Sequence, residues 1–332
     1  MKLKILNLLS DEQMEGIKSS LSDLITSRLA EKYEFAIAPL KRAKASLHNW
    51  QPDIIIIHDP CSWGILPYLI TLKFIKGKAK LVIQDRHYSA NFERIKITST
   101  FVFRLMLRLC HWCADRLLLV SHAQGVWMKK HKLVRSHKVT VIRQCQNCDR
   151  FLSLEPKTIE KPLTLAAYGN FIEQKGFDIL LQAVGLIPYV QFQLKIAGSG
   201  SDEAALHRLA EGNSKVQFVG QVEDIPAFLN DCDVVVIPSR WEPWGDICLE
   251  AKAASKSVIV SAVDGLVEQV QDFGYLVPPA DPQSLAKAIA RVCEMPPEDL
   301  KAQGMDARES VINAWDDYLD EWETLLCQLL KE

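Results

Sequence analysis

The sequence of 332 residues lacks the features that would place it outside the soluble globular class. Its longest uncharged stretch of note, C-S-W-G-I-L-P-Y-L-I-T-L from Cys61, is much shorter than the roughly 20 apolar residues that a transmembrane helix needs. The N-terminal run K-L-K-I-L-N-L-L breaks at Ser10 and Asp11, so it does not have the pattern of a cleavable signal. We therefore expect a protein of the cytoplasm, or of the inner face of the cell membrane.

Two further motifs are missing or poorly formed. No G-x-G-x-x-G follows the first apolar run, Leu3–Leu9, which argues against a dinucleotide-dependent dehydrogenase. The nine cysteines are odd in number and scattered, which indicates reduced thiols. The C-x-x-C pairs Cys110/Cys113 and Cys145/Cys148 suggest a zinc site, but one pair precedes an expected strand and the other follows one, at opposite ends of the sheet. Zinc is therefore the weaker interpretation, and we expect no metal.

The net charge of −2 conceals an uneven distribution. Residues 1–161 contain 27 Lys and Arg against 14 Asp and Glu, a net charge of +13, whereas residues 162–332 contain 12 against 27, a net charge of −15. A basic half predicts an anionic partner or an anionic membrane surface, while simple solvation and attraction between the halves explain it equally well. We expect no nucleic-acid partner.

Apolar runs alternate with helical patterns along the chain, which is the rhythm of doubly wound α/β domains with parallel sheets. A linker without periodicity, residues 149–162, separates two such series. The expected strands are 3–9, 34–38, 53–58, 80–84, 117–120 and 139–142 in the first series, and 163–168, 193–197, 216–219, 234–237 and 258–260 in the second. The expected helices of the first series are about 13–31, 62–74, 98–113 and 122–131, and a last helical pattern covers 311–330.

The most informative stretch is S-R-W-E-P-W-G-D-I-C-L-E-A, residues 239–251, between two apolar strands. Glu242 falls in the loop at the carboxyl end of the first strand, Gly245 and Asp246 open a helix, and Glu250 lies about one turn inside it. Ligands of parallel α/β sheets bind at this end of the strands, where a helix N-terminus favours phosphate. The two carboxylates could hold a hexose and a ribose; an ordinary solvated helix N-terminus is the alternative.

Five further segments flank this stretch in order: G-N-F-I-E-Q-K-G (169–176), A-G-S-G (197–200), F-V-G-Q-V (218–222), D-G-L-V-E (264–268) and G-Y-L-V-P-P-A-D-P (274–282). With the E-x7-E pair, the series resembles the retaining glycosyltransferases of family 4, which have the GT-B fold, over about residues 163–295. The resemblance implies two Rossmann-like doubly wound domains that face each other across a cleft. They would be an acceptor-binding domain (1–155) and a nucleotide-sugar-binding domain (156–310), with a C-terminal helix (311–332) that crosses back to the first domain.

The resemblance also implies roles for single residues. Glu242 would hold the sugar, Glu250 the ribose and Lys175 the diphosphate; the predicted catalytic residues are Glu242, Lys175 and His87. The remaining predicted donor-binding residues are Gly16, Gly169, Asn170, Gly198, Val219, Trp244, Gly245, Asp246 and Ile247. Asn170 stands where the family has an arginine. Either another cation (Arg86, Arg143 or Arg240) replaces that charge, or donor binding is weak, or the donor differs.

Two groups in the first half have open interpretations. His58 and His87 follow expected strands at the ligand edge of the sheet. Both could be structural hydrogen-bonding groups, or His87 could lie near the reacting sugar. Gln84 stands nearer the position at which the family usually has a histidine. The segment 94–113 places Arg104, Arg108 and His111 on one helical face beside a wide apolar arc. That pattern fits a core helix, which we favour, or a helix that docks into an anionic membrane interface.

The resemblance predicts a retaining, metal-independent hexosyltransferase that moves a sugar from a UDP- or GDP-sugar to the hydroxyl of a sugar or lipid-linked acceptor. Surface polysaccharide or glycolipid biosynthesis is the expected setting. A non-catalytic GT-B protein that binds a nucleotide sugar or a partner glycosyltransferase is the alternative, and Asn170 is its best support. No sequence feature favours an epimerase or a phosphorylase of the same fold.

Overall fold

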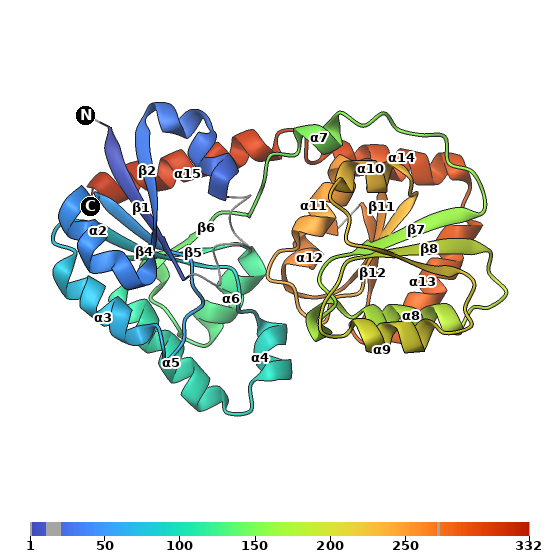
Figure 1. The fold of residues 1–332 in the computed structure, drawn as a ribbon, viewed down its shortest axis with the longest axis horizontal. Coiled ribbons are helices and arrows are strands. Elements are labelled where there is room, and N and C mark those ends of the chain that lie inside the picture. The colour runs from blue at the N-terminus through green and yellow to red at the C-terminus, as the bar shows by residue number, and fades with distance from the viewer. Residues whose placement is uncertain (1, 11–20, 271–272, 332) are drawn as a thin grey trace. The chain divides into compact units, whose positions relative to one another are not determined.

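The computed structural model describes residues 2–10, 21–270 and 273–331 (Figure 1). The chain divides into two compact units, of which the first consists of residues 1–147 and 315–332 and the second of residues 148–314. Each unit has its own six-stranded parallel sheet and its own hydrophobic core. The expected doubly wound α/β class is therefore confirmed for both.

The sheet of the first unit has the strand order β2-β1-β3-β4-β5-β6. Its central strand β3 is I-I-I-I with all four side chains buried, because helices cover both faces of a parallel sheet. The order reverses direction between β1 and β3, and this is where ligands of such sheets bind. The strands are β1 (Leu3–Leu9), β2 (Tyr33–Pro39), β3 (Ile54–Ile57), β4 (Lys80–Asp85), β5 (Arg116–Leu119) and β6 (Val139–Val141).

The described helices of the first unit are η1 (Arg28–Glu31), η2 (Leu40–Arg42), α2 (Ala43–Trp50), α3 (Leu66–Ile75), α4 (Ala90–Lys96), α5 (Thr100–Cys113), α6 (His122–Lys130), η3 (Ser136–Lys138) and α15 (Ala314–Lys331). Residues 21–26 are also helical, whereas the first part of the helix expected at 13–31 lies outside the described residues. The sequence did not predict α2 or α4. Helix α2 buries only Ala43 and Leu47, so its apolar periodicity is weak.

The sheet of the second unit has the order β12-β11-β10-β7-β8-β9 and reverses direction between β7 and β10. Its strands are β7 (Leu163–Tyr168), β8 (Phe192–Ala197), β9 (Val216–Gly220), β10 (Val234–Ile237), β11 (Ser257–Ser261) and β12 (Gly274–Val277). The edge strand β12 was not predicted as a strand, because only Val277 of its four residues is buried.

Helices connect the strands of the second sheet and cover it. They are α7 (Asp149–Leu152), η4 (Glu173–Lys175), α8 (Phe177–Gly185), α9 (Glu203–Ala210), α10 (Ile225–Asn230), α11 (Asp246–Ala253), α12 (Asp264–Val270), α13 (Pro282–Glu294) and α14 (Pro297–Glu309). Helix α13 has a strong start: Asp281 accepts a hydrogen bond from the amide of Ser284, and Pro282 occupies the first turn.

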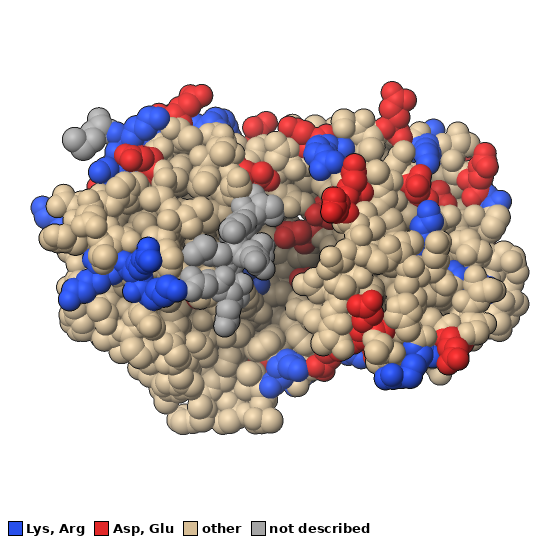
Figure 2. All heavy atoms as spheres, in the orientation of Figure 1, with Lys and Arg blue, Asp and Glu red and all other residues tan. Residues whose placement is uncertain are grey.

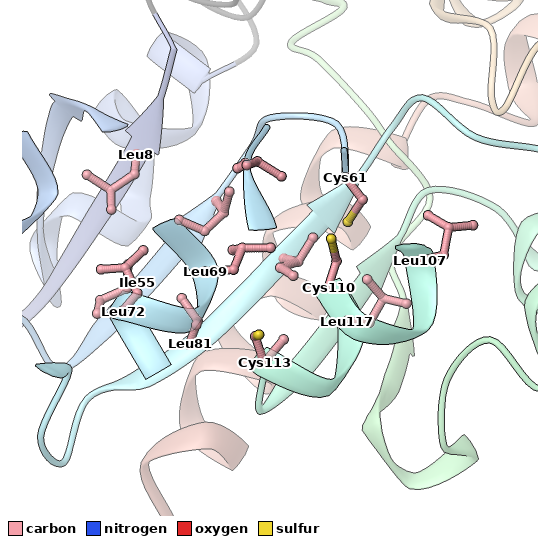
Figure 3. Packing of buried hydrophobic residues seen from close by; sticks show 14 of the residues in the cluster. Leu8, Ile55, Cys61, Leu69, Leu72, Leu81, Leu107, Cys110, Cys113 and Leu117 are labelled. Atoms are coloured by element: carbon pink, nitrogen blue, oxygen red, sulfur yellow. The ribbon is translucent and has the colours of Figure 1, made fainter. Parts of the chain in front are cut away.

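The core of the first unit accommodates cysteines as small apolar residues. Cys61, Cys110 and Cys113 pack among leucines from the sheet and from α3 and α5 (Figure 3). All nine cysteines are free thiols. Cys145 belongs to the first unit and Cys148 to the second. No three His, Cys, Asp or Glu side chains among the described residues are grouped so that they could hold a metal ion.

The terminal helix α15 packs on the first unit through one apolar stripe. The buried side chains Tyr318, Trp322, Leu325 and Leu329 recur at helical spacing along it. Ion pairs join its outer face to the segment 28–32: Arg28 Nη2 lies 2.7 Å from Asp320 Oδ1, and Lys32 pairs with Glu323. Of the helices that the structure describes, none is long and apolar enough to cross a bilayer.

Candidate donor-sugar site

The carboxyl ends of β7 and β10 carry the predicted donor residues of the second unit. Strand β10 ends at Ile237, the E-P-W-G loop follows, and helix α11 begins at Asp246 with Gly245 as its N-cap. The side chain of Glu242 is in the loop and that of Glu250 is in the second turn, as the sequence predicted. Because the strand order reverses between β7 and β10, a ligand can lie between their loops.

Glu242 is buried and fully engaged. Its Oε2 lies 2.5 Å from Nζ of Lys175, and Ser239 Oγ donates to the same oxygen at 3.4 Å. Gln174 Nε2 donates to Oε1 at 3.4 Å. The loop backbone is fixed as well, because the amide of Glu242 donates to Asp264 Oδ2 at 3.2 Å. The structure thus brings together the two residues for which sugar and phosphate binding were predicted.

Glu250 is held by a residue that the sequence did not single out. The hydroxyl of Tyr168, the last residue of β7, donates to Glu250 Oε2 at 2.7 Å. Burial raises the pKa of Tyr168 well above its usual value, and the negative charge of Glu250 raises it further. The phenol therefore stays protonated and remains a donor. Its position at the end of a strand at the ligand edge was the only signal in the sequence.

The glycines of this edge allow close approach of backbone segments. Gly198 has φ +142, and a Cβ there would lie 1.9 Å from the carbonyl oxygen of Gly169. A Cβ on Gly245, at φ +103, would lie 2.6 Å from Leu266 and 3.0 Å from Glu242 Cγ. Glycine is required because both positions combine a left-handed backbone with no room for a side chain.

Gln269 of α12 fixes the start of α11. The sequence did not single out this residue. Its Nε2 donates to the carbonyl oxygens of Trp244 at 2.7 Å and of Gly245 at 3.1 Å. Trp244 is buried, and its indole Nε1 has no hydrogen-bond partner among the described residues. Asp246 and Ile247 form the first turn of α11 and are half-buried, as is Val219 in β9.

Of the cations proposed to replace the missing arginine, only Arg240 belongs to the second unit. Asn170 is exposed in the loop after β7. Arg240 is engaged elsewhere: its guanidinium donates to both oxygens of Asp178, at 2.8 and 2.6 Å, and to the carbonyl oxygen of Glu173 at 2.8 Å. Hydrogen bonding to Asp178 raises the pKa of Arg240. The other two proposed cations, Arg86 and Arg143, belong to the first unit.

The segment Asp231-Cys232-Asp233 has the D-x-D pattern of a metal-binding motif, but it serves a structural role at the opposite end of the sheet. Asp233 Oδ2 accepts a hydrogen bond from the amide of Thr164 at 2.7 Å, just before β7 and β10 begin to pair. Asp231 Oδ1 lies 3.2 Å from Lys157 Nζ. Both carboxylates thus bind groups at the amino ends of the strands, between α10 and β10.

The ligand edge of the first unit carries a buried polar pair. His58 Nε2 lies 2.9 Å from Asn7 Oδ1, and both side chains are almost completely buried. His58 Nδ1 has no partner among the described residues. Burial lowers the pKa of His58 to about 3, with a further contribution from the positive charge of Arg86. His58 is therefore neutral at physiological pH and acts as a structural hydrogen-bonding group.

His87 lies in the loop after β4, where the sequence placed it. Asp85 Oδ1 accepts hydrogen bonds from the amides of His87 at 2.9 Å and Tyr88 at 3.2 Å, which fixes this turn. The ring of His87 is half-buried, and its Nε2 has no partner among the described residues. Gln84 is the partner of Arg86, whose Nη2 donates to Gln84 Oε1 at 3.1 Å. Gly16 lies outside the described residues.

The basic face of the segment 94–113 is anchored within the first unit. Arg104 donates two hydrogen bonds to the buried Glu93, at 2.6 and 3.0 Å. Arg108 donates to the carbonyl oxygens of residues 131 and 132, and His111 Nδ1 donates to that of Leu133. Helix α5 also buries Phe103 and Met106 in the core. These contacts fit a helix that packs in the core, although much of the apolar arc of α5 is exposed to solvent.

Comparison with known proteins identifies the class. Residues 150–310 match the family described as "Glycosyl transferases group 1". The chain is 28% identical over 182 residues to the lipopolysaccharide core biosynthesis glycosyltransferase LpsE of Rhizobium meliloti (strain 1021). The aligned residues cover 52% of this chain and 53% of that protein. The chain thus spans about half the length of this relative.

Solved structures share the fold at low sequence identity. A sucrose-phosphate synthase from Thermosynechococcus elongatus matches with a TM-score of 0.81 and 18% identity, over 99% of this chain and all of that one. Anabaena HepE in complex with UDP-glucose matches with a TM-score of 0.76 and 18% identity, over 98% of this chain and all of that one. The protein is therefore an α/β protein of the GT-B class, and the predicted fold is confirmed. Its segment 150–310 matches the group 1 glycosyl transferases, in agreement with the resemblance that the sequence motifs indicated.

Proposed function

We propose that the protein is a retaining glycosyltransferase that takes its sugar from a nucleotide diphosphate sugar. The observation that carries the proposal is the arrangement of Glu242 and Glu250 on either side of the N-terminus of α11, each held by a hydrogen-bond donor at the reversal point of the sheet. The family match and the UDP-glucose complex of Anabaena HepE support the same donor class. The second unit is then the donor-binding domain and the first is the acceptor-binding domain.

Each donor group has a place in this arrangement. The diphosphate would lie at the N-terminus of α11, where free amides and the helix dipole favour negative charge. Glu250 would accept hydrogen bonds from the ribose hydroxyls, and Glu242 from the sugar hydroxyls. Lys175 is paired with Glu242, so donor binding must exchange this ion pair for contacts of Lys175 with phosphate and of Glu242 with sugar.

The reaction replaces one bond at the anomeric carbon with another on the same face. The bond between this carbon and the diphosphate oxygen breaks, the acceptor hydroxyl oxygen bonds to the carbon, and its proton passes to the departing phosphate. Positioning and stabilisation of the diphosphate charge are the contributions of the protein. Lys175 and the α11 amides supply that stabilisation without a metal ion. His87, whose Nε2 has no partner in the described part of the chain, is the candidate hydrogen-bonding group of the first unit.

The acceptor is a sugar or a lipid-linked sugar, and the product serves the assembly of surface polysaccharide or glycolipid. LpsE of Rhizobium meliloti, whose name assigns it to lipopolysaccharide core biosynthesis, supports this setting. The strongly basic first half fits an acceptor carried by an anionic membrane. The protein would work in the cytoplasm at the inner face of that membrane.

One observation favours a second candidate function, a GT-B protein that binds a nucleotide sugar or a partner glycosyltransferase without transferring sugar. Asn170 lacks the positive charge of the usual arginine, and Arg240 is already paired with Asp178. An Asn170→Arg substitution separates the two candidates. It should strengthen donor binding in both, but should accelerate sugar transfer only if the protein is an enzyme.

The proposal is tested by thermal unfolding with UDP, GDP, ADP and their sugars, each with and without EDTA. A ligand at 100 times its Kd should stabilise the protein by about 2.7 kcal/mol. Selective stabilisation by one nucleotide, unchanged by EDTA and lost in Glu250→Gln, would support the donor site. The exposed Glu211→Gln is the matched control and should keep the response. If no nucleotide stabilises the wild type, the donor assignment is wrong.

Glu242→Gln separates the sugar from the nucleotide. Binding of the free nucleoside diphosphate should persist, because Glu242 is assigned to the sugar, whereas sugar transfer should fall by at least about a hundredfold. Equal loss of UDP and UDP-sugar binding would contradict this division of roles.

A further inference from the structure

Arg240, just after β10, binds the loop that follows β7. Its backbone amide donates to the carbonyl oxygen of Gln174 at 2.7 Å, and its Nη1 donates to the carbonyl oxygen of Glu173 at 2.8 Å. Lys175 is the next residue of that loop, so both contacts lie directly before the lysine assigned to the diphosphate. Arg240 thus joins the two loops that meet at the reversal point of the sheet.

The same guanidinium also binds the first turn of α8. Its Nη1 and Nη2 donate to the two carboxylate oxygens of Asp178, at 2.8 and 2.6 Å. A bidentate pair of this kind fixes the orientation of the two groups as well as their distance. Burial would raise the pKa of Asp178, but the hydrogen bonds and the charge of Arg240 bring it below its usual value. The carboxylate therefore stays ionised, and Arg240 has contacts on both sides of Lys175.

The backbone between these contacts has little room to move. Gly176 has φ +65, and a Cβ there would lie 2.1 Å from the carbonyl oxygen of Pro238 and 3.8 Å from Arg240 Nη1. Glycine is required because the left-handed backbone leaves no space for a side chain. The turn after Lys175 is therefore packed directly on the segment that leads from β10 to Glu242.

The position of Lys175 matters because few charges are available to the donor at this loop. Lys175 is the only Lys or Arg among residues 169–176, and Asn170 stands where the resemblance implies an arginine. The ammonium of Lys175 lies 2.5 Å from Glu242 Oε2. Lysine carries its charge on a flexible four-carbon stem, so the backbone must be held if that charge is to meet both Glu242 and an incoming phosphate.

The contacts of Arg240 argue against a direct role on the phosphate. To reach a ligand, its guanidinium would have to leave Asp178, a partly buried carboxylate that would then lack its cation. Figure 2 shows side chains of both charges over α8 and α9, at its lower right, so this surface has no excess of cations for a phosphate. Arg240 therefore acts on the site from behind the loop.

We propose that Arg240 is a positioning residue of the donor site: paired with Asp178, it holds Lys175 where the lysine can exchange Glu242 for the diphosphate of the nucleotide sugar. This inference rests on the proposed function, because it concerns the same site. Arg240 touches neither donor nor acceptor and acts through Lys175. Its loss should therefore weaken binding of the diphosphate and leave binding of the nucleoside unchanged.

Calorimetry with the full chain tests this difference. The probes are UDP, GDP or ADP, whichever stabilises the wild type in thermal unfolding, and the corresponding nucleoside. Arg240→Gln should weaken binding of the diphosphate about tenfold, because Lys175 loses part of a charge-assisted contact. Its affinity for the nucleoside should equal that of the wild type. Arg240→Lys should recover only part of the affinity, because lysine cannot form the bidentate pair with Asp178.

A double-mutant cycle shows whether Arg240 acts through Lys175. Lys175→Gln should weaken binding of the diphosphate more than Arg240→Gln does, and the double variant should bind no more weakly than Lys175→Gln alone. The matched control is Arg150→Gln, which removes an exposed arginine of the same unit whose Nη2 lies 3.1 Å from Asp224 Oδ1. This control should bind the diphosphate like the wild type.

Affinities are compared at a temperature at which every variant is folded, and Arg240→Lys replaces Arg240→Gln in the cycle if the latter does not fold. Unchanged diphosphate affinity in the Arg240 variants would overturn the inference and leave the proposed function intact. Equal losses for diphosphate and nucleoside would overturn it too, because they indicate a general disturbance of the fold. Additive losses in the cycle would assign Arg240 to the phosphate itself. A wild type that binds no nucleotide would contradict the proposed function and, with it, this inference.

Discussion

Acidification should destabilise the first unit through His58, and the size of the effect follows from burial. Burial lowers the pKa of His58 to about 3, whereas an unfolded histidine titrates near 6.5. Between these values the unfolded chain binds more protons than the native one, so stability is complete above about pH 6.5 and is lost as the pH falls. From pH 7.5 to 5.0 the loss is about 2 kcal/mol, and it scarcely changes if the folded pKa is anywhere below about 4.

Denaturant unfolding at both pH values measures this loss, with hydrogen exchange of β3 and β4 peptides to report on the first unit. The burial of His111 acts in the same direction, so the wild type should lose more than His58 alone explains. The difference between wild type and His58→Gln isolates His58, since glutamine can keep a hydrogen bond to Asn7 but cannot be protonated. The exposed His48→Gln should behave like the wild type.

An equal pH dependence in the wild type and in His58→Gln would refute this reasoning. If His58→Gln does not fold, the imidazole proton shifts of His58 in the wild-type protein give the same test. They should stay constant from pH 7.5 to 5.0. A midpoint near 6 would show that the buried ring accepts a proton at no cost.

Three further predictions concern packing and the donor site. Gly198→Ala should cost more than about 3 kcal/mol in urea unfolding, because its Cβ would meet the carbonyl oxygen of Gly169, whereas Gly185→Ala in α8, with open space around its Cβ, should cost nothing or stabilise by up to about 1 kcal/mol. Arg104→Ala should cost about 3 kcal/mol in thermal unfolding, because it leaves the Glu93 carboxylate buried without its cation; the exposed Arg94→Ala should have little effect. Tyr168→Phe should weaken nucleotide binding about tenfold in calorimetry, because Glu250 loses the donor that orients it, while unchanged affinity would show that Tyr168 has no part in ribose binding.

The sequence predicted the strands and the position of α11 because these depend on local signals. Continuous apolar runs mark the buried parallel strands, and the loop between β10 and α11 follows from glycine and proline at fixed places. Helix α4 was not predicted because it is only seven residues long, and β12 was not predicted because most of its residues are partly exposed. Short and edge elements carry too little periodicity to be read from one sequence.

The contacts of the site could not be predicted for a different reason. Tyr168 and Glu250 are 82 residues apart in sequence, and Lys175 and Glu242 are 67 apart. Only the folded sheet brings them together, and no local pattern encodes the pairing. Arg240 illustrates the limit: the sequence offered it as a replacement phosphate ligand, but the structure commits it to Asp178. A charged side chain near a predicted site can bind a ligand only if it is not already paired with a closer residue.

The path of the chain has a consequence for the order in which the protein folds on the ribosome. The second unit is one continuous segment, residues 148–314, whereas the first needs residues 315–332 to complete it. Trp322, Leu325 and Leu329 of α15 are fully buried in the finished first unit. Although its strands are synthesised first, the first unit can therefore be completed only after the whole second unit has been synthesised. Early termination just before α15 would leave a finished second unit joined to an incomplete first one.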